Sequence, residues 1–136
     1  MYYLDTNICV YFMKGKHPQL LSIMMKHEPK DIKIPAIVEA ELLYGVEKSV
    51  KKEDNYKKLV AFLTPFDIIP FGSKESGVYA AIRASLERKG TPIGPNDMLI
   101  AATVIANNGI LVTNNVSEFS RVDVLRHEDW TVSDKV

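Results

Sequence analysis

Cysteine is nearly absent from this chain of 136 residues, in which Cys9 is the only thiol. A single thiol cannot form an intramolecular disulfide, so the sequence excludes a disulfide-stapled secreted scaffold and predicts a reducing, cytoplasmic environment. Long hydrophobic runs are also missing, because the longest clearly apolar stretch covers residues 98–106 and a membrane-spanning helix needs about 20 residues. The first acidic residue is Asp5, which argues against a basic and then apolar leader peptide. We therefore expect no membrane segment.

An excess of charge of either sign is missing as well, since 17 basic residues balance 17 acidic residues. This balance argues against a general polyanion-binding protein and excludes a basic tail, so contact with nucleic acid has to come from local patches. Repeats, low-complexity segments and Gly/Ser-rich or Pro-rich linkers are absent too. With 46% apolar and 25% charged residues, the composition is that of a globular protein, and we predict a single domain over residues 1–136.

Short apolar runs alternate with longer amphipathic stretches along the chain. This alternation is typical of an α/β protein whose parallel sheet carries helices on both faces. In such sheets, ligands bind beyond the carboxyl ends of the strands, so polar residues that follow strands are candidate site residues. We predict strands at residues 2–4, 31–34, 67–71, 110–113 and 122–125, and helices at residues 8–13, 19–26, 35–50, 53–63, 73–89 and 95–107.

Acidic and amide residues lie at several of these strand ends and helix starts. Asp5 ends the first predicted strand, Asp97 lies in the first turn of the last predicted helix, and Asn115 and Glu118 follow the fourth strand. Each has an ordinary structural explanation, because Asp5 can cap a helix, Asp97 can pair with the helix dipole and Glu118 can be a solvated loop acid. Their joint occurrence favours a site for a hard divalent cation that activates water and holds a phosphodiester.

Two glutamates on the helix predicted at residues 35–50 are further candidates. Glu39 and Glu41 are two residues apart and therefore point about 200° away from each other, so both cannot face one pocket. Both border the same apolar stripe, and the periodicity does not choose between them. Solvated surface glutamates also explain the pattern.

Four sequence blocks resemble PIN-domain ribonucleases, and most closely the VapC toxins of toxin–antitoxin pairs. They follow the family's order and, with smaller matches such as Glu128-Asp129-Trp130, span residues 3–130. The blocks are Tyr3-Leu4-Asp5-Thr6-Asn7, Glu41-Leu42-Leu43-Tyr44-Gly45, Ile93-Gly94-Pro95-Asn96-Asp97 and Leu111-Val112-Thr113-Asn114-Asn115.

The resemblance implies a three-layer α/β/α fold with an active pocket at the carboxyl edge of the sheet. It implies that Asp5, Glu41 and Asp97 form a catalytic acidic triad that holds Mg²⁺ or Mn²⁺, which selects Glu41 over Glu39. It also assigns supporting roles to Thr6, Asn7 and Thr113. The family commonly has a fourth acid where this chain has Asn115; Glu118 is the candidate for the missing carboxylate, and the number of bound metal ions stays open.

The implied chemistry is metal-dependent hydrolysis of RNA that leaves 5′-phosphate and 3′-hydroxyl ends, with tRNA among the substrates of the family. The resemblance also implies a homodimer and a VapB-type antitoxin that blocks the pocket. We predict RNA contacts for Arg83, Arg88 and Lys89, which precede the block that contains Asp97. A lysine cluster at residues 48–58 is either a second phosphate-binding surface or a solvated face. The apolar residues of the segment 20–25 are either core or a groove for a partner helix.

Two other functions compete with a ribonuclease toxin. A catalytically impaired PIN domain could bind RNA or protein without cleavage, and Asn115 in place of an acid supports this alternative. A phosphotransferase of the haloacid-dehalogenase type also begins with a strand and an aspartate, but it needs a second acid at the position of Asn7.

Overall fold

A five-stranded parallel sheet organises the computed structural model of the chain, which describes residues 1–132. The order of the strands is β3-β2-β1-β4-β5, so β1 lies at the centre between β2 and β4. The chain therefore builds the sheet outward from β1 in one direction and then in the other, and the switch point lies between β1 and β4. The strands are β1 (Tyr2–Leu4), β2 (Ile32–Pro35), β3 (Asp67–Ile69), β4 (Ile110–Val112) and β5 (His127–Glu128).

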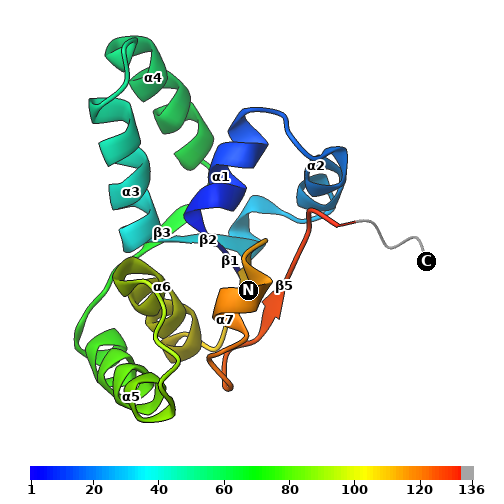
Figure 1. Cartoon of the computed structure of the whole chain (residues 1–136). Coiled ribbons are helices and arrows are strands. Elements are labelled where there is room, and N and C mark those ends of the chain that lie inside the picture. Colours follow the sequence, from blue (N-terminus) through cyan, green and yellow to red (C-terminus); the bar gives the residue numbers. More distant parts are fainter. Residues whose placement is uncertain (133–136) are drawn as a thin grey trace.

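Helices cover both faces of this sheet (Figure 1). The helices that precede β3 lie on one face, and those that follow β3 lie on the other, as right-handed crossovers on either side of a switch point require. This three-layer arrangement confirms the fold class expected from the sequence. The helices are α1 (Thr6–Met13), α2 (Pro18–Met25), α3 (Ala36–Glu47), α4 (Lys52–Leu63), α5 (Ser73–Lys89), α6 (Pro95–Ala106) and α7 (Val116–Phe119), with a 3₁₀ turn at Pro29–Asp31.

The hydrophobic core lies between the sheet and these helices. The central strands contribute aliphatic side chains, among them Leu4, Ile34 and Leu111, each with no exposed surface. Trp130 near the described end of the chain is 3% exposed and stacks on His27, with the ring centroids 5.0 Å apart. The core thus extends to the last residues before position 133. A separate observation concerns the helices: within residues 1–132, none is long and apolar enough to cross a bilayer.

The last predicted strand, at residues 122–125, is wrong. These residues form turns in which Val122 and Leu125 are buried while Val124 is 71% exposed. The apolar pattern therefore comes from two side chains that anchor a turn in the core. The strand begins later, because Leu111 donates its N–H to Arg126 O at 2.9 Å and Thr113 donates to Glu128 O at 3.0 Å, which fixes the register of β5.

Helix α7 was not expected, since the sequence pattern placed Glu118 in a loop. Its four residues are too few for an amphipathic pattern. The helix lies in the short connection between β4 and β5, on the edge of the sheet where β1 and β4 end. Glu118 is thereby held close to the residues that follow both strands.

Candidate active site

Asp5 occupies the centre of the candidate site, directly after β1. It is 5% exposed and is the N-cap of α1, where its Oδ1 accepts a hydrogen bond from Ile8 N–H at 3.0 Å. Burial raises the pKa of Asp5 to about 6, and the negative charge of Glu41 adds to the rise, although hydrogen bonds from Thr113 and Ile8 act against it. Asp5 is thus the helix cap that its place before α1 suggested. It is also a buried carboxylate whose ionised form is disfavoured by its surroundings.

Asp97 lies in the first turn of α6, beside Glu118 of α7. Glu118 accepts hydrogen bonds from Gly94 N–H at 2.6 Å and from Asn115 Nδ2 at 2.5 Å. A Cβ on Gly94 would lie 3.4 Å from Asp97 Oδ2 and 3.6 Å from Glu118 Oε1, so both carboxylates lie against the same backbone. The two acids share a hydrogen bond. They form a close pair at the carboxyl edge of the sheet.

The two members of this pair have opposite pKa shifts. Burial, the hydrogen bond to Glu118 and the charges of Glu118, Asp5 and Glu41 together raise the pKa of Asp97 to about 7. Burial also acts to raise the pKa of Glu118, but the hydrogen bonds that Glu118 accepts and the charge of Arg121 outweigh it, and the pKa is lowered. Below about pH 7, the pair therefore retains one proton, which lies mainly on Asp97 beside the ionised Glu118.

Glu41 approaches the site from α3. Its Oε1 accepts a hydrogen bond from Thr6 Oγ1 at 2.5 Å, and its Oε2 accepts one from Asn96 Nδ2 at 3.3 Å. Glu39 makes no side-chain hydrogen bond with any residue in the range 1–132. Helix periodicity did not choose between the two glutamates. The structure places Glu41, the one that the resemblance selected, in contact with other residues of the site. Asn96 was not among the predicted site residues, although it lies within the block that contains Asp97.

The supporting residues divide into those within the site and one outside it. Thr113 is fully buried, contacts the Asp5 carboxylate and accepts a hydrogen bond from Asn115 N–H at 2.9 Å. Thr6 binds Glu41, as described above. Asn7 is exposed, and its side chain takes part in none of the hydrogen bonds found within residues 1–132. Asp129, which was not predicted to belong to the site, contributes a negative charge that also raises the pKa of Asp5.

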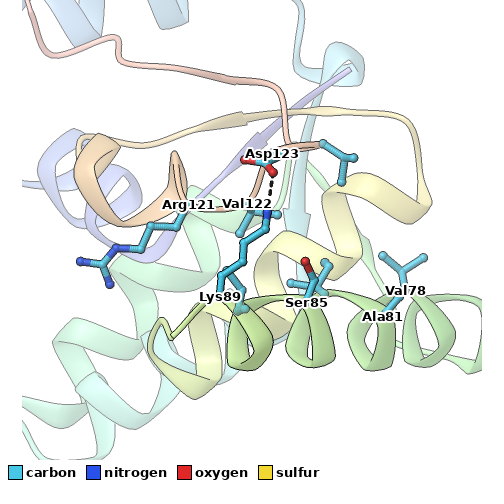
Figure 2. Close-up of a pocket in the computed structure, with 10 residues that line it drawn as sticks. Val78, Ala81, Ser85, Lys89, Arg121, Val122 and Asp123 are labelled. Carbon is cyan, nitrogen blue, oxygen red and sulfur yellow. Dashed lines mark hydrogen bonds and ion pairs between the residues drawn. The ribbon is translucent and has the colours of Figure 1, made fainter. Parts of the chain in front are cut away.

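The predicted RNA-binding residues lie on the exposed C-terminal half of α5. Arg83 donates to Tyr79 Oη at 3.0 Å and to Glu87 Oε2 at 3.4 Å along its own helix. Lys89 pairs with Asp123 at 2.5 Å beside a pocket of about 320 Å³ that both residues line, and Figure 2 shows this ion pair. Two of the three predicted cations, Arg83 and Lys89, therefore already have partners within the fold.

The donor set fits a hard divalent cation by its chemistry. Asp5, Glu41 and Asp97 supply carboxylate oxygens, which Mg²⁺ and Mn²⁺ prefer. The raised pKa values of Asp5 and Asp97 come first from burial and also from neighbouring negative charge, which a cation would neutralise. Within residues 1–132, however, no three acidic, histidine or cysteine side chains are already arranged as a metal-binding group. The carboxylates instead bind protein groups, Glu41 binding Thr6 and Asp97 binding Glu118.

The chain matches a known protein family over most of its length. A model of the PIN domain matches residues 2–125 of the chain. This chain belongs to the PIN-domain family. Its central parallel sheet, with acids gathered at the edge where β1 and β4 end, is the arrangement that the resemblance implied.

Individual relatives are similar to this PIN domain over nearly its whole length. Ribonuclease VapC2 of Rickettsia felis is 48% identical over 134 residues, which cover 96% of this chain and 98% of that protein. The tRNA(fMet)-specific endonuclease VapC of Salmonella typhimurium is 35% identical over 127 residues, with 93% and 96% covered. A chain in the crystal structure of Rickettsia felis VapBC2, bound to a DNA fragment from its promoter, matches with a TM-score of 0.88 and 46% identity over 95% of this chain and 98% of that chain. The expected similarity to VapC proteins is confirmed.

Proposed function

We propose that this PIN domain is an endoribonuclease toxin of the VapC type that hydrolyses RNA with a divalent cation held by Asp5, Glu41 and Asp97. The observation that carries the proposal is the convergence of these carboxylates, from three separate segments, at one edge of the sheet. In addition to the effect of burial, Glu41 raises the pKa of Asp5 there, and Asp5 and Glu41 both raise the pKa of Asp97. Carboxylates held this close together repel one another, so their convergence does not stabilise the fold. A cation that compensates the repulsion accounts for the cost.

The side chains of the site have distinct tasks in this proposal. Ile8 N–H and Thr113 hold the Asp5 carboxylate, while Thr6 and Asn96 hold Glu41. The pair of Asp97 and Glu118 retains one proton below about pH 7, and Asp97 would lose this proton on holding a divalent cation. A bound divalent cation supplies positive charge for the phosphodiester and lowers the pKa of water. Asn115 adds no charge but orients Glu118, which supports Glu118 as the fourth carboxylate.

Matched glutamate variants test the catalytic role. Glu41→Gln removes a carboxylate of the triad without changing its size, and we expect cleavage of RNA with Mg²⁺ to fall at least about 100-fold. Glu39→Gln, two residues away on the same helix, removes the same charge and should cleave like the parent protein. Equal activity of the two variants would contradict the assignment.

Asp97→Asn provides the second test, because it removes a carboxylate that is costly to ionise. We expect a folded protein with at least about 100-fold slower cleavage, and a chelator should abolish cleavage by the parent protein. A variant that keeps the parent's turnover with Mg²⁺ would show that Asp97 has no catalytic role. If the parent protein retains RNA without cleaving it, the impaired PIN domain would be the better function.

The partners follow from the relatives. The name of the Salmonella relative makes tRNA the first substrate to test, and the VapBC complexes support a VapB-type antitoxin. An apolar pocket of about 320 Å³, which includes Met25 with 79% of its surface exposed, suits the apolar face of such a partner. Of the apolar segment 20–25, Leu20 and Met24 belong to the core instead. A homodimer and a cytoplasmic location, where RNA is encountered, remain our predictions.

A further inference from the structure

A groove of about 820 Å³ opens beside the candidate active site. It lies between α1, α3 and α4, which adjoin one another in Figure 1. Thr6 and Glu41 of the site line this groove, and the lining continues through the ends of α1 and α3. The other lining residues are Val10, Met13, Lys14, Leu42, Gly45, Val46, Ser49, Asn55, Lys58, Leu59 and Ala61.

The groove lining carries negative charge at the active site and positive charge further along. Glu41 is the only acid in the lining. Lys14 and Lys58 are both exposed, and neither has an ion pair with any residue of the range 1–132. Arg83 and Lys89, in contrast, are held by Glu87 and Asp123. The two groove lysines are therefore available to bind an anion without breaking an existing contact.

The distance from the site to Lys14 suits an RNA strand that continues past the cleaved phosphodiester. Lys14 follows Thr6 by eight residues, which corresponds to about 12 Å along α1. A lysine at this distance is too remote for the phosphate beside Glu41 and can meet a phosphate further along the same strand. The groove thus combines an acid, Glu41, where a cation is needed with lysines where the backbone of RNA continues.

The middle of the groove is open at Gly45, which belongs to its lining. A Cβ built on Gly45 meets no atom within 4 Å. Apolar side chains such as Met13 and Val46 lie in the same lining and offer surface to a ribose or a base. A glycine inside a helix lowers helix stability, so the open space comes at a local cost to α3.

We propose that this groove binds single-stranded RNA adjacent to the cleaved phosphodiester, with Lys14 and Lys58 each neutralising one phosphate and Gly45 leaving room for the strand. This inference rests on the proposed ribonuclease function and assigns its substrate track. It places the substrate on α1, α3 and α4 rather than along the cations of α5.

Charge removal gives the first test. In the Asp97→Asn background with Mg²⁺, where cleavage is expected to be slow, the fluorescence anisotropy of a short labelled single-stranded RNA of mixed sequence reports binding. Lys14→Gln with Lys58→Gln should weaken binding about tenfold at low salt and reduce the salt slope of log K by about 1.4, because each phosphate of a single strand contributes about 0.7. Lys16→Gln with Lys26→Gln removes the same charge from exposed positions outside the groove lining and should leave the slope unchanged.

Filling the groove gives a test that is independent of charge. Gly45→Leu should weaken binding of the same RNA about tenfold while leaving the salt slope as in the parent protein, since both lysines remain. The melting temperature should not fall, because the new side chain enters open space and replaces a helical glycine. If the melting temperature does fall, the lysine variants alone decide the matter.

The outcomes separate this inference from the proposed function. Cleavage by the wild-type protein with Mg²⁺, together with parent-like RNA binding by the lysine variants, would overturn the groove and leave the ribonuclease intact. Failure of the wild-type protein to bind or cleave RNA would overturn both. Loss of antitoxin binding with unchanged RNA binding would assign the groove to the protein partner and would equally overturn the inference.

Discussion

At the residue scale, the site is defined by carboxylates that the fold brings together against their mutual repulsion. Asp5 is held by a backbone N–H and a buried threonine, and Glu41 by a threonine and an asparagine. Asp97 accepts no hydrogen bond from an N–H group or a hydroxyl within residues 1–132 and instead shares a proton with Glu118. The pair of Asp97 and Glu118 is therefore the part of the site whose charge depends most on its surroundings.

Replacement of Glu118 by glutamine tests this dependence. Glu118→Gln removes the neighbouring negative charge while its amide oxygen can still accept from Gly94 N–H, so we expect the pKa of Asp97 to fall below about 7. It should stay above the ordinary value of 3.8, because burial and the charges of Asp5 and Glu41 remain. A pH titration of the Asp97 carboxyl carbon by NMR without metal measures the shift. An unchanged pKa would show that Glu118 does not control the proton.

At the scale of elements, the sequence predicts the helices and strands that have a clear hydrophobic pattern of their own. Strand β1 and helix α5 were predicted from an apolar run and a long periodic segment, within the bounds that the structure shows. The short elements α7 and β5 carry no such pattern, because a four-residue helix and a two-residue strand are fixed by contacts with other segments. Residues 122–125 show the reverse case, in which an apolar pattern belongs to a buried turn.

The same distinction applies to the site. Asp5 and Asp97 could be proposed from their places at a strand end and a helix start. Glu41 could not, because its neighbour Glu39 fits the same helix pattern, and the choice needed the family resemblance or the contact with Thr6. Asn96 and Asp129 act only through spatial neighbours, which the sequence alone does not specify.

The turn between α6 and β4 packs closely against the core at Gly109, and a substitution there tests this packing. A Cβ on Gly109 would lie 2.3 Å from Tyr3 Cε1 and 3.3 Å from Met1 O, and Tyr3 is 3% exposed. Gly109→Ala should lower the free energy of unfolding by about 1–3 kcal/mol, since neither the ring nor the backbone can move freely. Urea unfolding followed by circular dichroism measures the change.

Gly77 provides the control for this prediction. It lies within α5, and a Cβ there meets no atom within 4 Å. Gly77→Ala should therefore raise the free energy of unfolding by up to about 1 kcal/mol through the better helix propensity of alanine. Destabilisation of equal size in both variants would contradict a specific close approach at Gly109.

At the scale of the whole molecule, the sheet topology joins the fold to the site. Because β1 pairs with both β2 and β4 in parallel, the residues that follow β1 and β4 emerge side by side, and the connections that begin there return over opposite faces (Figure 1). The same topology that completes the hydrophobic core thus concentrates negative charge at one edge. The stability of the fold therefore depends on the protonation of that edge.

This dependence predicts how the stability of the metal-free protein changes with pH. In the unfolded chain, Asp5 and Asp97 ionise near 3.8, whereas in the folded chain their pKa values are about 6 and about 7. Between these values, the folded state binds more protons than the unfolded state, so the free energy of unfolding falls as pH rises, and the fall ends above pH 7. In the presence of a chelator, the melting temperature should drop by roughly 10 °C between pH 5 and pH 8.

Two comparisons make this prediction specific. Asp97→Asn has no carboxyl to ionise at residue 97, so its melting temperature should fall less over the same pH range than that of the parent protein, whereas Glu39→Gln should follow the parent. Mg²⁺ should raise the melting temperature more at pH 8 than at pH 5, because it binds the ionised carboxylates of the folded state. A melting temperature that rises from pH 5 to pH 8 in chelator, with the same profile for Asp97→Asn, would show that the crowded carboxylates do not limit the stability of the fold.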